Sequence, residues 1–459
     1  MSADRTPSDG DRPGRPDATP DRPGYGYPRR GWAALADHPP PGLRGVGERW
    51  RSPLRGPWLT SVFGLVLLVG LPLVFLTGLL DYLAYGPQFG QAFPRDVGWL
   101  RLPQFDWPTR PSWLFRVTQG LHVALGITLV PVVLGKLWSV IPKLFDWPPA
   151  RSLAQVLERL SLLLLVGGIL FEIATGLLNI QYAYLFGFDF YTAHYFGAWV
   201  FVAALVVHVA LRLSRLRTAL RSRPARAELA VPRAGTRPEP PDPDGLVASH
   251  PDPATVSRRG ALALVGGLSL LLAGLTVGQS LDGSWRRTAL LLPRGRQPGT
   301  GPTGFPVNRT AAAAGVGAAD TGPDWRLTLR AEGRQASLDR AALLAMPQHT
   351  ARLPIACVEG WSTLQTWTGV RLRDLAALVG ADRPGSAHVR SLEKAGLFAQ
   401  ATLQANQVLD PDSLLALTVN GADLTPDHGY PARVIVPALP GVHCTKWVTE
   451  IEFRGRPHA

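Results

Sequence analysis

The sequence predicts a multi-domain protein: an all-α transmembrane bundle of four helices plus one, followed by an α+β domain. Three observations lead to this fold class. Five apolar blocks each have about the 20 residues that a bilayer crossing requires. Arginines stand beside these blocks rather than within them, as in the cytoplasmic loops of membrane proteins. From Trp325 onward, short β-type runs, turn residues and a helical run are typical of a globular domain.

Residues 1–57 are rich in Pro, Gly, Asp and Arg, and we expect a disordered cytoplasmic tail. They are not a signal peptide, because the first apolar block begins too late and is too long. Residues 58–215 are expected to form a four-helix membrane domain, 216–259 a Pro- and Arg-rich cytoplasmic linker, 260–281 the fifth helix and 282–324 a connector. The predicted transmembrane helices are Trp58–Leu80, Val117–Gly135, Leu160–Ile180, Phe190–Leu211 and Gly260–Leu281.

The distribution of basic residues predicts how these helices cross the lipid bilayer. Residues 1–57 and residues 212–259 each carry ten Arg, whereas the loop 179–189 carries none. We therefore expect a multi-pass protein of the cell membrane, with a cytoplasmic N-terminus and everything after Leu281 outside the cytoplasm. The net charge of +13 comes from 43 Arg and 4 Lys. These arginines do not line one face of a helix, and the sequence has no nucleic-acid-binding motif, so we expect no nucleic-acid partner.

The stretch SRRGALALVGG, residues 257–267, has two alternative interpretations. It resembles a twin-arginine export signal placed inside the chain, with Arg258 and Arg259 as the pair. It is also explained as a positive-inside stop before the fifth helix. The distinction matters because the twin-arginine route exports domains that have already folded around a cofactor.

Ionisable residues inside membrane helices are functional candidates. His122 lies six residues after Arg116, and His194 lies five residues after Asp189, so each sits about 7–9 Å inside the outer surface. The two helices run in the same direction. At equal depth, His122 and His194 can therefore ligate one haem iron from opposite faces. Small residues beside them would let a flat macrocycle approach the backbone: Gly120, Gly126, Gly197 and Ala198.

A second pair of positions lies deeper in the same two helices. His208 follows His194 by 14 residues, a rise of about 21 Å on nearly the same helix face. The matching position 14 residues after His122 is Lys136, so the inner level lacks a second histidine. We expect one haem b, with His208 as a further candidate iron ligand. The alternative is that these histidines form hydrogen bonds between helices, while Glu172 is a buried hydrogen-bonding residue or part of a quinone site. The four-helix pattern, over about residues 58–215, resembles the membrane cytochrome b family found with oxidoreductases.

The predicted C-terminal domain covers residues 325–459 and contains both cysteines, Cys357 and Cys444. Outside the cytoplasm, two cysteines ordinarily form a disulfide. A buried thiol, a catalytic thiol and a metal ligand are the other interpretations, and the residues alone leave all four open. The β-type runs are 325–330, 388–393, 414–421, 432–437 and 446–453, and residues 370–380 are expected to be helical.

Two motifs in this domain resemble a known family. They are CVEGWS, residues 357–362, and NGADLTPDHGYPARVIVPALPGVHCTKWVTEIEF, residues 420–453. Together they resemble the oxidoreductase molybdopterin-binding domain, the fold shared by sulfite oxidases and the catalytic subunit of the periplasmic methionine sulfoxide reductase. The likeness covers about residues 300–459. It implies Mo-molybdopterin as the cofactor, with pterin contacts that begin near residue 305.

The same resemblance implies a role for each matching residue. Cys357 matches the cysteine whose thiolate binds molybdenum directly, and the thiol must be deprotonated to bind. His428 and Arg433 match positions that hold the pterin and its phosphate, Arg433 through a charge-assisted contact. Without the family, the alternative for Arg433 and Lys446 is ordinary surface charge. The remaining matching positions around the pterin are Asn308, Cys444, Thr445 and Lys446.

The resemblance implies a molybdenum-dependent oxidoreductase that exchanges an oxygen atom and two electrons with a small extracytoplasmic substrate. We expect a sulfoxide or another sulfur compound, because CVEGWS lacks the Arg-containing run that follows the metal cysteine in sulfite oxidases. The haem would relay electrons to or from membrane quinone or another redox carrier. Two alternatives stay open. One is a sulfite-type oxidase; the other is a catalytically silent, membrane-anchored sensor with a Cys357–Cys444 bridge.

Overall fold

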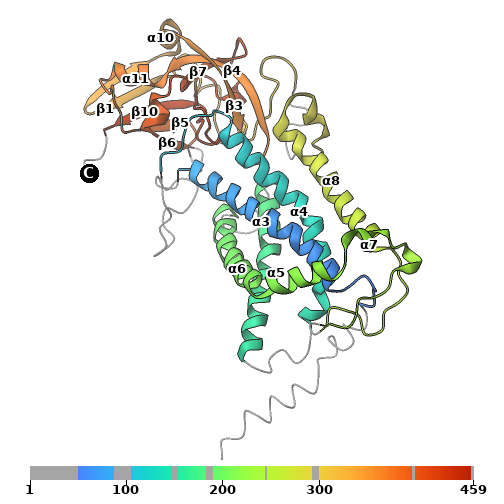
Figure 1. Ribbon diagram of the computed structural model, residues 1–459. Helices are drawn as coiled ribbons and strands as arrows, with labels where there is room; N and C mark the ends of the chain where they lie inside the picture. The colour runs from blue at the N-terminus through green and yellow to red at the C-terminus, as the bar shows by residue number, and fades with distance from the viewer. Residues whose placement is uncertain are drawn as a thin grey trace, which may run out of the picture.

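The computed structural model describes residues 50–86, 105–145, 153–181, 190–242, 245–291, 299–394 and 399–455. The predicted N-terminal tail therefore lies almost entirely outside the described residues. A group of long helices adjoins a strand-rich C-terminal part at one end (Figure 1). Within the described residues, five helices are long and apolar enough to cross a membrane. They are α3 (Pro57–Ala84), α4 (Leu114–Leu144), α5 (Leu153–Gln181), α6 (Phe190–Ser222) and α8 (Arg258–Leu281).

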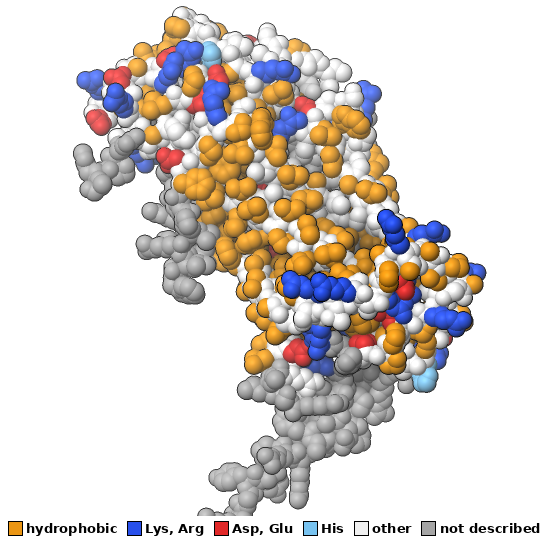
Figure 2. Space-filling view, in the orientation of Figure 1, with side chains coloured by type: hydrophobic (Ala, Val, Ile, Leu, Met, Phe, Trp, Pro, Cys, Tyr) orange, Lys and Arg blue, Asp and Glu red, His pale blue; other side chains and the backbone are white. Residues whose placement is uncertain are grey.

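The five helices form a ring of four with one helix outside it. α3 packs against α4 and α6, and α5 packs against α4 and α6, which closes the ring. α8 packs against α4 from outside. Leucine and valine side chains are exposed on the outer surfaces of these helices, and hydrophobic side chains dominate this part of the surface in Figure 2. Such a surface suits contact with lipid rather than with water. A helix can lie in lipid because its backbone N–H and C=O groups form hydrogen bonds within the helix.

The predicted linker is a packed structure and not only a tether. It contains the short helix α7 (Ala225–Ala230). The carboxylate of Glu239 accepts a hydrogen bond from Trp58 N, at 3.1 Å, where the first N–H groups of α3 lack helical partners. Arg258, one of the twin arginines, is 2% exposed and lies 3.0 Å from the Glu228 carboxylate. The segment therefore covers the end of the bundle at which α3 begins.

The C-terminal part contains two sheets, each with five strands among the described residues. The first has the order β2-β1-β10-β5-β6, and the second has the order β3-β4-β7-β8 with β9 also paired to β7. β1 and β10 are parallel, and the other paired strands are antiparallel. The strands are β1 (Leu327–Ala331), β2 (Arg334–Leu338), β3 (His349–Ala356), β4 (Ser362–Arg371), β5 (Ser386–Ser391), β6 (Gln400–Gln404), β7 (Leu414–Val419), β8 (Ala422–Asp423), β9 (Arg433–Ile435) and β10 (Val448–Arg454).

Three short helices accompany the sheets: α10 (Arg340–Ala345), α11 (Leu372–Leu378) and α12 (Ala405–Leu409). Each of the five β-type runs in the sequence overlaps one strand. The run expected to be helical from residue 370 becomes α11 only at Leu372. Val370 and Arg371 instead complete β4, where they pair with Leu415 and Leu414 of β7. Pairing with β7 therefore makes these two residues part of a strand and not of the helix that was expected.

Residues 105–113, just before α4, and the first turn of α4 contact the C-terminal part of the protein. Trp107, 2% exposed, donates its indole N–H to Ala438 O at 2.9 Å. The Thr109 hydroxyl donates to the Asp410 carboxylate at 2.7 Å. Phe115, in the first turn of α4, belongs to the same buried cluster as the core of the C-terminal part. The C-terminal domain thus sits where α4 begins, and α4 runs away from it.

Candidate active site

The predicted metal cysteine lies in a tight turn between two strands. β3 ends just before Cys357, and β4 begins just after Trp361. Cys357 N donates to Trp361 O, and Gly360 N donates to Cys357 O, each at 2.9 Å. Gly360 has a φ of 89°, a left-handed conformation that favours glycine. The turn keeps the Cys357 thiol buried, with the residue 3% exposed.

The HGYPAR motif brings a neutral and a charged side chain together. Thr425 caps the short helix η4 (Pro426–His428), and its hydroxyl lies 2.7 Å from His428 Nδ1. Burial, followed by the charge of Arg433, lowers the pKa of His428 to about 4, so its imidazole is neutral at pH 7. Arg433 begins β9 and donates to His428 O at 3.2 Å. Burial lowers the pKa of Arg433 to about 10, which leaves its guanidinium charged.

Lys446 lies beside these two residues. Its amine donates to Asp427 O at 3.0 Å and to Arg309 O. It also lies 4.7 Å from the ring centre of Trp447. Burial is the main cause that lowers the pKa of Lys446 to about 7, and the charge of Arg433 adds to it. The amine is therefore close to half-protonated at neutral pH.

The structure places five of the predicted residues around one small cavity. The five are Asn308, Cys357, His428, Arg433 and Lys446. Cys444 and Thr445 are each 2% exposed and are not among the residues that line this cavity. Cys444 forms no disulfide with Cys357, and burial raises the pKa of its thiol. Cys444 and Thr445 precede Lys446 directly in the sequence, but of these three residues only Lys446 lines the cavity.

Two observations bear on what this cavity can hold. Arg433 Nε is buried without a hydrogen-bond partner among the described residues, which is unusual for a buried polar atom. Across the part of the chain that the structure describes, no three His, Cys, Asp or Glu side chains are grouped as metal ligands. A metal at Cys357 would therefore take its other donor atoms from a cofactor. An anionic cofactor would meet Arg433 and Lys446.

We expect Lys446 to make the cofactor-free protein more stable as the pH rises above 7. In the folded chain its pKa of about 7 lies below the ordinary 10.5, so between these values the unfolded chain binds more protons. Stability rises with pH wherever the unfolded state binds more protons. The Lys446→Met variant lacks this dependence. Relative to wild type, its thermal midpoint should fall by about 2–4 °C between pH 7 and pH 8.

The exposed Lys394→Met variant controls for the loss of any lysine. Its midpoint should move in parallel with that of the wild type between the two pH values. A parallel course for Lys446→Met would contradict the depressed pKa.

A second cavity lies inside the helical bundle and contains His122 and His194. The centres of the two imidazole rings are 6.1 Å apart, with the ring planes at 88°. His122 Nδ1 is hydrogen-bonded to Val74 O at 3.0 Å. His194 Nδ1 lies 2.9 Å from Thr175 Oγ1 and 3.1 Å from the Glu172 carboxylate. Because a carbonyl oxygen only accepts, Nδ1 of His122 carries the proton, and its Nε2 keeps a lone pair.

The small residues expected near the histidines have two different positions. Gly126 and Ala198 line the bundle cavity. Gly120 and Gly197 instead allow helices to approach each other. A Cβ at Gly120 would meet the side chain of Ser280 in α8, and a Cβ at Gly197 would meet side chains of α5. The expectation that all four face a macrocycle is therefore wrong for Gly120 and Gly197, because helix contacts occupy their faces.

Two consecutive residues, Cys357 and Val358, line different cavities, Cys357 the C-terminal one and Val358 the one in the helical bundle. Val358 lines the bundle cavity together with His122 and His194. Gln119 of α4, 5% exposed, donates its side-chain N–H to Val358 O at 2.6 Å. One peptide bond therefore separates Cys357 from a residue in the wall of the bundle cavity. Sequence reasoning missed this contact, because 239 positions separate Gln119 and Val358 and neither belongs to a motif.

His208 and Lys136 line a third cavity instead, which lies among the same four helices. The structure does not bring His208 to the cavity of His122 and His194.

The geometry of the C-terminal domain is that of a buried thiol in a pocket with neutral and cationic donors. Residues 314–459 match the family model of the oxidoreductase molybdopterin binding domain. The C-terminal domain is therefore an oxidoreductase molybdopterin-binding domain of the sulfite oxidase type.

Particular relatives support this assignment. An uncharacterized oxidoreductase, YuiH, of Bacillus subtilis (strain 168) is 34% identical over 115 residues, which are 25% of this chain and 57% of the relative. A nitrate reductase [NAD(P)H] of Hordeum vulgare is 38% identical over 94 residues, covering 18% of this chain and 10% of the relative. A sulfite oxidase of Arabidopsis thaliana is 35% identical over 99 residues, covering 18% and 25%. The chain thus spans little more than half of the first relative and smaller shares of the other two.

Proposed function

We propose that the protein is a membrane-bound molybdopterin-dependent oxidoreductase. It exchanges an oxygen atom and two electrons with a small sulfur-containing molecule outside the cytoplasm. His122 and His194 would hold one haem b, which would supply one-electron transfer between the molybdenum cofactor and membrane quinone. The observation that carries the proposal is that consecutive residues line the two cavities: Cys357 lines the C-terminal cavity, and Val358 lines the cavity of the two histidines.

The residues around Cys357 fit an anionic pterin cofactor. Cys357 offers a thiolate, a soft ligand that suits molybdenum. Arg433 offers a charged guanidinium with a buried Nε that has no partner among the described residues, and Lys446 offers an amine that an anion would keep protonated. When bound, the cofactor supplies the oxygen-atom and two-electron chemistry. The chain would hold it in place, and His428, which is neutral at pH 7, lines the same cavity without adding a charge.

The bundle cavity fits a haem. A ring-centre spacing of 6.1 Å leaves room for one iron between His122 and His194, with metal–nitrogen bonds of about 2.0 Å. Each ring is fixed by a hydrogen bond at Nδ1, as in other proteins whose histidines ligate metals through Nε2. Glu172 accordingly acts as a partner of His194. The remaining lining is mostly apolar and comes from all four helices of the ring.

The position of the C-terminal domain supports an extracytoplasmic active site. The domain packs against the first turn of α4, where Phe115 joins its core. Lys136 and Lys143 lie in the second half of α4. Because basic residues favour the cytoplasmic end of membrane helices, the opposite end, with the domain, would face outward.

We expect the Gln119→Leu variant to transfer electrons between the two centres about ten- to a hundredfold more slowly. Leucine has a similar size but cannot donate to Val358 O, so a buried carbonyl loses its partner and the turn at Cys357 loosens from α4. Small misplacements of this kind have effects of such size. The measurement is flash reduction of the haem, followed by its reoxidation at the haem absorbance band.

The Ser280→Ala variant is the matched control. Ser280 donates to Gly360 O at 2.7 Å, so the variant also removes one hydrogen bond to the same turn, but from α8, which carries no histidine. Equal slowing in both variants would show that the turn's general attachment matters and that Gln119 has no special part.

The proposal as a whole is tested by composition. The purified protein should contain one molybdenum, one pterin and one haem b per chain, measured by metal analysis, pterin oxidation products and the reduced-minus-oxidised visible spectrum. Neither molybdenum nor a b-type spectrum would disprove the proposal. Molybdenum without haem would leave the C-terminal domain as an enzyme and end the role of His122 and His194.

A sulfite-type oxidase is the second candidate, since relatives named sulfite oxidase match this chain. The two candidates differ in direction. In the proposed reaction a sulfoxide oxidises the reduced haem, whereas in the second sulfite reduces the oxidised haem. Mixing the protein separately with methionine sulfoxide and with sulfite, and following the haem band, distinguishes them.

A further inference from the structure

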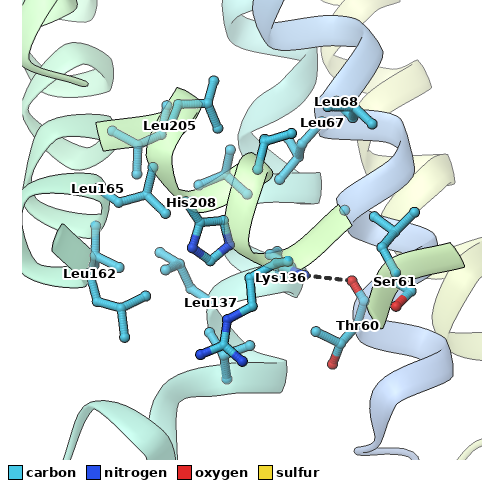
Figure 3. A pocket seen from close by; sticks show the side chains of 18 of the residues that line it. Thr60, Ser61, Leu67, Leu68, Lys136, Leu137, Leu162, Leu165, Leu205 and His208 are labelled. Carbon is cyan, nitrogen blue, oxygen red and sulfur yellow. Dashed lines mark hydrogen bonds between the residues drawn. The ribbon is translucent and has the colours of Figure 1, made fainter. Parts of the chain in front are cut away.

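The third cavity plays no part in the chemistry described so far. It lies among α3, α4, α5 and α6, and its walls consist largely of leucine and valine side chains. Figure 3 shows His208 from α6 and Lys136 from α4 among these walls. The labelled leucines around them are Leu67, Leu68, Leu137, Leu162, Leu165 and Leu205. An apolar space with two nitrogen-bearing groups is suited to a lipid-soluble molecule with a polar head.

The polar groups in this cavity have unused hydrogen-bonding capacity. His208 has no hydrogen-bond partner among the described residues. Thr60, 6% exposed, lines the cavity with a hydroxyl that is buried without a partner in the described part of the chain. Lys136 donates one hydrogen bond, to Thr60 O at 2.7 Å, and an ammonium has three donors. A head group that accepts hydrogen bonds would provide these side chains with the partners they lack.

The charges of the lining exclude some occupants. The ionisable residues that line the cavity are His208 and four cations, with no carboxylate among the described lining residues. Arg212, one of the cations, is paired with Glu158, which is not itself part of the lining. A cationic head is therefore disfavoured, and a head with oxygen acceptors is favoured.

The cavity differs from the haem cavity in the feature that makes a histidine a metal ligand. His122 and His194 are each held by a hydrogen bond at Nδ1, whereas His208 has none among the described residues. Lys136 occupies the position that a second imidazole would need. The two cavities nevertheless share wall residues, so an occupant of one lies next to an occupant of the other. The shared residues are Leu71, Val133, Ile169 and Phe201.

We propose that this cavity binds the head of the membrane quinone, with His208 and Lys136 hydrogen-bonded to its ring oxygens. The inference rests on the proposed function, since it places the electron partner beside the proposed haem. In the direction of sulfoxide reduction, a bound quinol is oxidised to quinone as its two O–H bonds break. Its two electrons pass singly to the haem and on to the molybdenum site. Its two protons pass to water, one of them by way of the His208 imidazole.

The test uses the full-length protein in detergent with menadiol, a soluble quinol, as the reductant. Haem reduction by menadiol should be about tenfold slower in His208→Leu and in Lys136→Met, because each loses a hydrogen bond to the head. Reduction by dithionite, haem content and molybdenum content should stay at wild-type values. Arg217→Met is the matched control, because it removes an exposed cation from the same part of α6 outside the cavity lining, and its rate should not change.

Three outcomes would overturn the proposal. Loss of a haem from His208→Leu would make His208 an iron ligand. Wild-type menadiol rates in both cavity variants would exclude the quinone head. A phospholipid retained by the wild type and lost from both variants, with quinone absent throughout, would assign the cavity to lipid.

Quinone content, measured after extraction, separates this inference from the proposed function. Quinone retained by a wild-type protein without haem, and lost from His208→Leu, would support the cavity and disprove the haem relay. Haem and molybdenum present at full content, with quinone absent and menadiol rates unchanged, would support the relay and disprove the cavity.

Discussion

The Cys357→Ser variant should lose turnover by more than about a hundredfold while keeping its fold. Serine is nearly isosteric, and the turn that positions residue 357 depends on backbone hydrogen bonds to Trp361 and Gly360, which the substitution leaves intact. What changes is the proposed molybdenum ligand, because a hydroxyl is harder and far less readily deprotonated than a thiol. Even substitutions of residues behind a metal ligand reduce activity by about 10–100-fold. Replacing the ligand itself should exceed this.

The activity is measured as oxidation of dithionite-reduced protein by methionine sulfoxide, beside the pterin content and the thermal midpoint. Unchanged pterin content and midpoint would show that the loss is chemical and not structural. The Cys444→Ser variant completes the experiment, since the structure places Cys444 outside the cavity lining. Turnover that survives in Cys357→Ser and disappears in Cys444→Ser would assign the metal to the other thiol.

The His122→Ala and His194→Ala variants should each contain less than about a tenth of the wild-type haem. The two imidazoles face one space from opposite helices, and neither is expected to retain the iron alone as a stable low-spin site. Reduction of methionine sulfoxide by menadiol should stop in both variants. Reduction by a dye that reaches the molybdenum site directly should continue, because Cys357 and its cavity are unaffected.

Haem content is measured by the pyridine haemochrome spectrum, and molybdenum content serves as the control for folding of the C-terminal domain. Full haem content in either variant would disprove bis-histidine ligation. A Thr175→Val variant tests the hydrogen bond that fixes His194, since valine keeps the shape but cannot accept from Nδ1. It should retain haem with an altered reduction potential, as expected for a changed partner of a metal ligand.

Much of the fold could be predicted from local patterns. The five membrane-length helices follow from apolar length and flanking charge, and both properties belong to one stretch of chain at a time. The equal depth of His122 and His194 follows from counting residues along two helices, and the rings lie 6.1 Å apart. The end of strand β4 was harder to predict from the sequence, because Val370 and Arg371 belong to β4 only through their pairing with β7.

The candidate site also has residues that the sequence predicts correctly and residues that it does not. Cys357, His428 and Lys446 are found by their motifs, and the structure brings them to one cavity with Asn308 and Arg433. Cys444 and Thr445 belong to the same motif but turn out to lie off the cavity. In a loop, adjacent residues point in different directions, and only the packed structure decides which of them face a ligand.

By itself, the sequence determined that the chain has membrane helices with spaced histidines and a molybdopterin-binding domain, because hydrophobic length, helical spacing and short motifs are local properties. The tertiary structure alone decided that Val358 stands in the wall of the histidine cavity and that residues 225–230 and 258 belong to a packed cover on the bundle. Both depend on contacts between distant segments. The hydrogen bond from Gln119 to Val358 O spans 239 positions, and the hydrogen bond from the Trp107 indole to Ala438 O spans 331.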